Sequence, residues 1–379
     1  MSTMEIYLDN AATTRVCPEA AQAAADAMLN SYGNPNSTHA KGREAKKLMD
    51  SARKSVASAL GCAPQELFFT SCGSESDNWA LWSGAEYVSR KGGHVISSTV
   101  EHDAIRRGLD ELERRGYEVT RLAPGEGGAV TAEQVKAALR PDTILVSLML
   151  VNNETGAVTD IRSISRVLKV ANPKALMHTD AVQGFLKVPF SAKTLGADLI
   201  SISGHKIHAP KGIGALYIKS GIRLKPLIVG GSQEDGRRAG TENVPYICAF
   251  SEAARIGSSL AKEAQERMRT LRGYAAGRLE SENPGLVTIG GGAPHILSVS
   301  LPGYRSEVIM NFLESRGIYV SRSSACKRGA RSHVLEAMGL SPAVIDGAIR
   351  VGLSRYTTQE EIDALCDAVK AARETLSHA

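Results

Sequence analysis

The feature that most constrains the fold is a regular alternation of short apolar runs with amphipathic stretches. Continuous apolar runs are typical of parallel strands that are buried on both faces of a sheet. The amphipathic stretches between them, such as 106–116 and 131–140, predict helices. The pattern therefore predicts an α/β fold with a mostly parallel, seven-stranded sheet flanked by helices. The expected strands are 66–70, 94–100, 117–122, 143–151, 174–180, 197–203 and 214–219.

The alternation ends at about Pro245. A long helical run then ends near Pro284, and shorter strand-like runs at 296–301 and 318–322 mix with helices. We therefore expect a large domain at 15–255 and a smaller α+β domain made of 1–14 and 256–379.

Composition and charge exclude several classes of protein. The 379 residues carry a net charge of only +5 and no basic run long enough for a nucleic-acid surface. The N-terminus lacks a signal-peptide pattern, and the longest apolar run, 144–151, is too short to cross a bilayer. We therefore expect a cytoplasmic protein that binds neither membranes nor nucleic acid directly. The six cysteines form no C-x-x-C pair, so we expect any functional cysteine to act singly.

Polar residues follow five of the expected strands. Ligands of open parallel sheets bind outside the carboxyl ends of the strands, so these residues should converge on one site. They are Ser71 to Glu75, Glu101 with His102, Asn152 to Glu154, Asp180 with Gln183, and Gly204 to Lys206.

Each of these residues alone has an ordinary explanation. Asp180 can cap a helix, Asn153 can lie in a turn, and most lysines, Lys206 included, are simply solvated. His205 and His208 suggest a metal only weakly, because no carboxylate cluster accompanies them, and we expect none. The ordinary explanations do not account for the joint occurrence of these residues at five strand ends.

Pyridoxal 5'-phosphate accounts for the whole set. This cofactor needs a lysine amine for its Schiff base, a carboxylate at its pyridine nitrogen and a phosphate cradle. Lys206, Asp180 and the turn at Gly73 and Ser74 supply these groups. The start of a helix with small residues offers free N–H groups to a phosphate.

The chain also resembles the cysteine desulfurases of the NifS/IscS type, which are fold type I pyridoxal-phosphate enzymes of the class V aminotransferase family. The resemblance covers nearly the whole length and is carried by YLDNAATTRV (7–16), YGNPNSTH (32–39), FTSCGSESDN (69–78), VEHDA (100–104), VNNETG (151–156), TDAVQ (179–183), SGHKIHAPKGIGALY (203–217), GRRAGTENV (236–244), SSAC (323–326), SHVLEAMG (332–339) and IRVGLSRYTT (349–358).

The resemblance implies roles for individual residues. Lys206 would form the Schiff base, Asp180 would hold the pyridine nitrogen, and Gln183 would donate to the ring oxygen. His102 would stack on the ring and assist proton transfer, and Asn153 with Arg350 would bind the substrate carboxylate. The phosphate site would comprise Gly73, Ser74, Ser203, His205 and, from the neighbouring subunit, Thr241, which implies a homodimer.

Cys326 lies in a polar, basic segment without an apolar period, and the nearby Arg322, Lys327 and Arg328 favour a thiolate. The resemblance implies that this cysteine takes sulfur from L-cysteine as a persulfide, leaves L-alanine, and passes the sulfur to an acceptor protein. The segment after Cys326 is shorter and more basic than in many relatives. It leaves the acceptor open among iron–sulfur cluster assembly, tRNA thiolation and DNA sulfur modification.

Two alternatives remain at this point. A related class V aminotransferase-like enzyme, such as a selenocysteine lyase, would keep the cofactor but differ in substrate. A non-catalytic assembly subunit would keep only the fold, and the presence of Lys206, Asp180, His102 and Cys326 argues against it.

Overall fold

The computed structural model describes residues 5–125, 127–322 and 331–376. Its centre is a seven-stranded sheet in the order β2-β8-β7-β6-β5-β3-β4. β8 runs antiparallel to both of its neighbours, whereas the other pairs are parallel, so the predicted mostly parallel sheet is confirmed. The strands are β2 (Leu67–Thr70), β3 (His94–Ser98), β4 (Glu118–Leu122), β5 (Thr143–Ser147), β6 (Leu176–Asp180), β7 (Leu199–Ser203) and β8 (Gly214–Ile218).

Neighbouring residues of the central strands belong to two different hydrophobic clusters, because successive side chains of a strand point to opposite faces of the sheet. Leu145 packs in the cluster that contains residues of α3 (Gly73–Val88) and α4 (Asp103–Arg114), whereas Val146 packs in the cluster on the opposite face. The helices of this part are α1 (Pro18–Asn30), α2 (Ala40–Leu60), α3 (Gly73–Val88), α4 (Asp103–Arg114), α5 (Ala132–Ala138), α6 (Ile161–Ala171), α7 (Ala192–Leu195), α8 (Gln233–Gly236) and α9 (Val244–Ser259), with the 3-10 turns η1 (Pro64–Glu66) and η2 (Gly204–Lys206).

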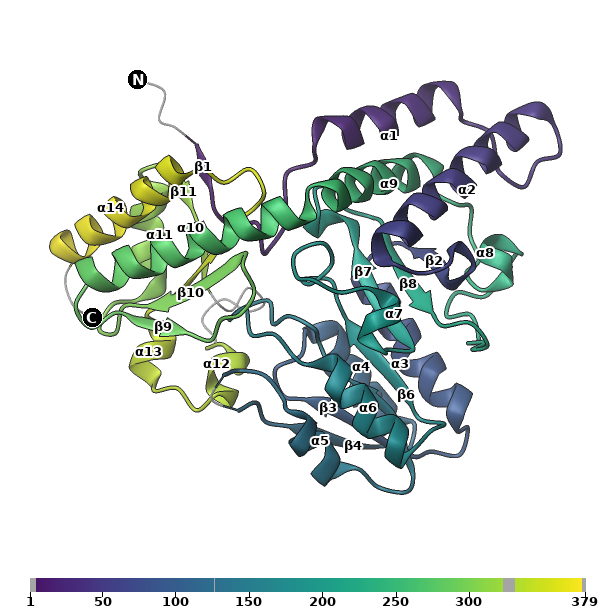
Figure 1. Ribbon diagram of the computed structural model, residues 1–379, viewed down its shortest axis with the longest axis horizontal. Coiled ribbons are helices and arrows are strands. Elements are labelled where there is room, and N and C mark those ends of the chain that lie inside the picture. The colour runs from purple at the N-terminus through teal and green to yellow at the C-terminus, as the bar shows by residue number, and fades with distance from the viewer. Residues whose placement is uncertain (1–4, 126, 323–330, 377–379) are drawn as a thin grey trace.

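A separate apolar cluster surrounds a four-stranded sheet in the order β12-β13-β10-β9. Figure 1 shows α9 and α10 running in succession from the central sheet to this smaller one. The elements are β1 (Ile6–Tyr7), α10 (Ala261–Glu282), β9 (Val287–Ile289), β10 (Ile296–Ser300), α11 (Ser306–Glu314), β11 (Ile318–Tyr319), β12 (Ser321–Arg322), α12 (His333–Ala337), α13 (Pro342–Asp346), β13 (Ala348–Gly352) and α14 (Gln359–Thr375). The domain limits at 15–255 and 256–379 stay a prediction.

Two of the expected strands differ in the structure. The run at 143–151 leaves the sheet after Ser147, although the Leu150 amide still donates to the Asp180 carbonyl at 2.8 Å. The run at 318–322 forms two strands, because β11 pairs with β1 and β12 pairs with β13. Within the described ranges, no helix is both long and apolar enough to span a membrane.

Candidate active site

Lys206 ends η2, directly after the central strand β7. Its Nζ donates hydrogen bonds of 2.7 Å to the carbonyl oxygens of both Ala11 and Ala12. Burial, followed by the charge of Arg350, lowers the pKa of Lys206 to about 8. A larger fraction of this amine is therefore uncharged near neutral pH than of an ordinary lysine, as a nucleophile or base requires.

Asp180 is the last residue of β6 and is buried. Its Oδ1 accepts a hydrogen bond from the Val182 amide at 2.9 Å. Burial raises the pKa of Asp180, whereas the charges of His102 and Lys206 lower it. The structure thus brings three of the predicted residues, from the ends of β3, β6 and β7, into electrostatic contact.

Gln183 lies on the turn after β6. Its Nε2 donates to the Ala11 carbonyl at 2.7 Å, so it shares this acceptor with Lys206, and its Oε1 lies 3.3 Å from the His295 Nε2. His102 is exposed at the N-terminus of α4, where its Nδ1 accepts a hydrogen bond of 3.2 Å from the Ala104 amide.

The predicted phosphate cradle lies at the start of α3. A side chain at Gly73 would place its Cβ 2.8 Å from Val182 Cγ2, which explains why the smallest residue stands where α3 approaches the β6 loop. The Ser203 Oγ is buried and has no hydrogen-bond partner among the described residues. Ser74 is exposed at the same helix end. His205 Nδ1 lies 3.2 Å from Thr13 Oγ1, and burial lowers the pKa of His205 to about 3.

Arg350 lies on β13 of the smaller sheet and is only 2% exposed. It donates to the Asn153 carbonyl at 2.8 Å and to Asp9 Oδ1 at 2.9 Å. Its Nε has no partner among the described residues. A guanidinium has five N–H donors, so these contacts fix its orientation and leave donors for a carboxylate.

The remaining predictions concern Thr241, a metal at His208, and Cys326. Thr241 is exposed and, with Ser71, lines a hollow of about 240 Å³ beside the ion pair of Arg238 and Glu75. His208 Nδ1 contacts the Arg15 carbonyl at 2.9 Å, and no group of three metal-ligating side chains occurs in the described parts of the chain. Cys326 lies outside the described residues.

Sequence reasoning missed several groups of this site. The Ala11 and Ala12 carbonyls and Asp9 lie in a segment noted only for its resemblance. Glu154 was noted only for its place after a strand, but its carboxyl is buried, accepts a hydrogen bond from Ser332 and has its pKa raised to about 7 by desolvation. Lys187 gave no signal beyond its place four residues after Gln183.

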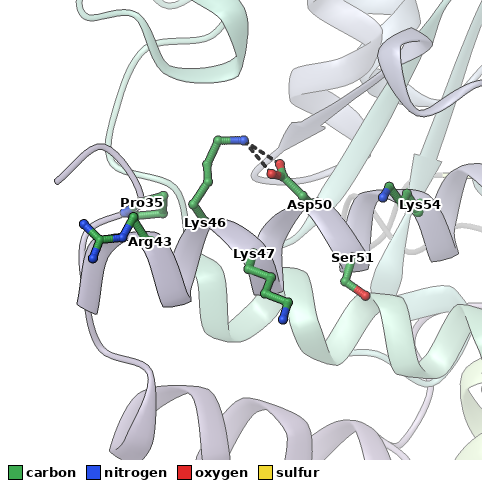
Figure 2. Close-up of a pocket in the computed structure, with 7 residues that line it drawn as sticks. All are labelled: Pro35, Arg43, Lys46, Lys47, Asp50, Ser51 and Lys54. Carbon is green, nitrogen blue, oxygen red and sulfur yellow. Dashed lines mark hydrogen bonds and ion pairs between the residues drawn. The ribbon is translucent and has the colours of Figure 1, made fainter. Parts of the chain in front are cut away.

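A larger hollow of about 520 Å³ lies along α2 (Figure 2). The Lys46 amine there points to the Asp50 carboxylate at 2.6 Å, and the other lining residues are Pro35, Arg43, Lys47, Ser51 and Lys54. None of these belongs to the predicted site, so the size of this hollow does not make it the reaction centre.

The chain is similar to known proteins in both sequence and fold. The family model of class V aminotransferases matches residues 6–365. Cysteine desulfurase 2 of Trichormus variabilis is 43% identical over 363 residues, which cover 94% of this chain and 90% of that protein. A solved NifS-like protein is 38% identical with a TM-score of 0.93, covering 98% of this chain and 100% of that one. The solved structure of SspA in complex with cysteine is 31% identical with a TM-score of 0.81, covering 94% and 100%. The chain therefore belongs to the class V aminotransferase family.

Proposed function

We propose that the protein is a cysteine desulfurase that uses pyridoxal 5'-phosphate to convert L-cysteine to L-alanine. The observation that carries this proposal is the Lys206 amine directly after β7, which the Ala11 and Ala12 carbonyls hold within the electrostatic reach of Asp180 and Arg350. The similarity to curated cysteine desulfurases and to SspA in complex with cysteine supports the substrate.

The residues fit the cofactor. The Ser203 hydroxyl is buried without a partner in the described part of the chain, beside the free amides of α3, as a phosphate site would require. Lys206 would hold the cofactor covalently, Asp180 would accept from its pyridine nitrogen, and Gly73, Ser74, Ser203 and His205 would surround the phosphate. When bound, the cofactor supplies an electron-withdrawing ring that acidifies the α-carbon of an amino acid.

Each residue of the site then has its own role in the reaction. Arg350, with Asn153 beside it, orients the substrate carboxylate, and the Lys206 amine accepts the α-proton, assisted by His102. The Cys326 thiolate attacks the substrate sulfur, so an S–S bond forms while the C–S bond breaks and leaves its electron pair on the carbon skeleton. Protonation of that skeleton gives L-alanine, and the persulfide sulfur passes to an acceptor protein. Thr241 completes the phosphate site of a partner subunit in a homodimer.

Incubation with L-cysteine tests this proposal. We expect stoichiometric L-alanine and a mass increase of about one sulfur atom on the peptide that contains Cys326. Cys326→Ser should retain the visible absorption of the bound cofactor but form no persulfide, whereas Lys206→Ala should lose both. Alanine release from selenocysteine but not from cysteine would instead favour a selenocysteine lyase, and normal persulfide formation elsewhere in Cys326→Ser would overturn the role of Cys326.

A further inference from the structure

Arg53 and Glu234 form an ion pair that has no part in the proposed reaction. The pair joins α2 to α8, with 2.6 Å between Arg53 Nη2 and Glu234 Oε1 and 2.7 Å between Arg53 Nη1 and Glu234 Oε2. The side chain of Glu234 is only 2% exposed and that of Arg53 is 15% exposed. Two parallel hydrogen bonds between a guanidinium and a carboxylate fix the geometry of the pair, so α8 is held in one position relative to α2.

The pair also covers the free edge of β2, which is an edge strand of the seven-stranded sheet. Arg53 Nη1 donates to the Leu67 carbonyl at 2.6 Å, and the Phe69 amide donates to Glu234 Oε2 at 2.9 Å. An edge strand presents N–H and C=O groups that need partners. Covering the edge is therefore one structural reason for this ion pair.

The backbone of α8 needs a further reason. Glu234 has a φ of 48° and Asp235 a φ of 57°, a left-handed conformation that is uncommon for residues other than glycine. Such a conformation persists only where the surrounding structure enforces it. The hydrogen bonds of Glu234 with Arg53 and Phe69 hold the first of the two residues in place.

The turn that begins at Glu234 leads the chain to Thr241. Gln233, directly before Glu234, accepts a hydrogen bond of 3.3 Å through its Oε1 from the amide of Gly240, directly before Thr241. Glu234 and Thr241 also line the same hollow of about 240 Å³. The position of Thr241 therefore depends on the anchored Glu234.

We propose that Arg53 and Glu234 are positioning residues that act on the partner subunit: their ion pair holds Thr241 in the place from which it completes the partner's phosphate site. The inference rests on the proposed function, in which Thr241 reaches a cofactor that is bound by the partner. Loss of the ion pair in one protomer should then weaken cofactor binding in the other protomer. A purely structural pair would instead weaken the protomer that carries the substitution.

Mixed dimers test this inference. Two differently tagged copies of the full-length protein are co-expressed, and one copy carries Lys206→Ala, so only the other copy shows the visible absorption of the bound cofactor. Arg53→Met is placed in the Lys206→Ala copy or, in a second dimer, in the copy with the intact lysine. During dialysis, the cofactor should be lost several-fold faster in the first dimer than in a dimer without Arg53→Met, and the second dimer should change little.

Arg140→Met in the Lys206→Ala copy is the matched control and should leave the retention of the cofactor unchanged. It also removes an arginine ion pair, because Arg140 pairs with Glu118 of β4, the opposite edge strand of the sheet. When the Lys206→Ala copy also carries Thr241→Ala, Arg53→Met should cause no additional loss, because the ion pair acts through Thr241.

Arg53→Met can fail to fold, so Arg53→Lys is measured in the same dimers. It keeps the positive charge but loses the planar fork, and it should cause a smaller loss of cofactor, again only from the other copy.

The inference is overturned if dimers with Arg53→Met and Arg140→Met in the Lys206→Ala copy retain the cofactor equally. A loss confined to the copy that carries Arg53→Met, an undiminished effect of Arg53→Met beside Thr241→Ala, or a protein that stays monomeric would overturn it as well. Cofactor retention does not depend on turnover. The expected loss in a protein that forms no persulfide would therefore refute the proposed function alone, and normal turnover without that loss would refute the role of the ion pair alone.

Discussion

Glu101→Gln should make the protein more stable at neutral pH. Glu101 follows β3 and is 1% exposed, and its pKa is raised to about 8 from 4.5, mainly by burial. The folded state therefore favours the protonated carboxyl. That contribution is fully present below pH 4.5 and is lost as the pH rises to about 8.

The geometry makes glutamine a good mimic of the protonated acid. Glu101 Oε2 accepts from the Met149 amide at 3.0 Å, and Oε1 lies 2.5 Å from the Ser98 hydroxyl. A glutamine can keep the acceptor to Met149 and donate to Ser98. The pKa of Glu101 is thus about 3.5 pH units above 4.5 in the folded protein. Ionisation of Glu101 therefore lowers the free energy of unfolding of the wild type by on the order of 4–5 kcal/mol above pH 8. The free energy of unfolding of Glu101→Gln should exceed that of the wild type by about 3 kcal/mol at pH 7 and by less than about 1 kcal/mol at pH 5.

Urea denaturation of the wild type and Glu101→Gln at pH 5, 6, 7 and 8 measures this difference. Glu118→Gln is the matched control, because Arg140 lowers the pKa of the exposed Glu118 from 4.5, so this carboxyl stays ionised and its contribution should change little from pH 5 to 8. A difference in the free energy of unfolding between the wild type and Glu101→Gln that stays constant from pH 5 to 8 would show that Glu101 is ionised in the folded protein, and the reasoning from burial would be wrong.

Two further predictions concern the site. Arg350→Lys keeps the positive charge but loses the planar fork of the guanidinium, so one charged hydrogen bond of about 1.5–3 kcal/mol should be lost. The KM for L-cysteine should therefore rise roughly 10- to 100-fold. An unchanged KM with the same kcat would contradict the role of Arg350 in binding the substrate carboxylate. Gly73→Ala places a Cβ 2.8 Å from Val182 Cγ2, so α3 must shift, and the protein should retain less cofactor after dialysis and lose about 1–3 kcal/mol of stability. Full cofactor retention would show that the cradle tolerates the shift.

Much of the central sheet could be predicted from the sequence, because strands buried on both faces appear as apolar runs with little ambiguity. Residues at the strand ends, such as Asp180 and Lys206, were found for the same reason: a parallel sheet brings its carboxyl ends to one edge. The end of β5 was not predicted, because residues 148–151 stay apolar and buried after they leave the sheet.

The missed parts of the site have physical reasons as well. The carbonyls of Ala11 and Ala12 bind Lys206 through the backbone, so no side chain signals them. In the sequence, Lys187 looks like an ordinary solvated lysine in a turn. The left-handed backbone of Leu186, the residue before it, has no signal in the sequence. Asp9 meets Arg350 across 341 positions of the sequence, a separation at which no local pattern operates.

The N-terminal segment connects the Lys206 amine to both sheets. β1 pairs with β11 beside the smaller sheet, Asn10 donates to the Gly352 carbonyl at 2.9 Å, and the next two carbonyls hold Lys206 at the end of β7. A rigid-body tilt of the smaller sheet would therefore pull these acceptors away from Lys206. The hydrogen bonds of the Lys206 amine therefore depend on the position of the smaller sheet as well as on the end of β7.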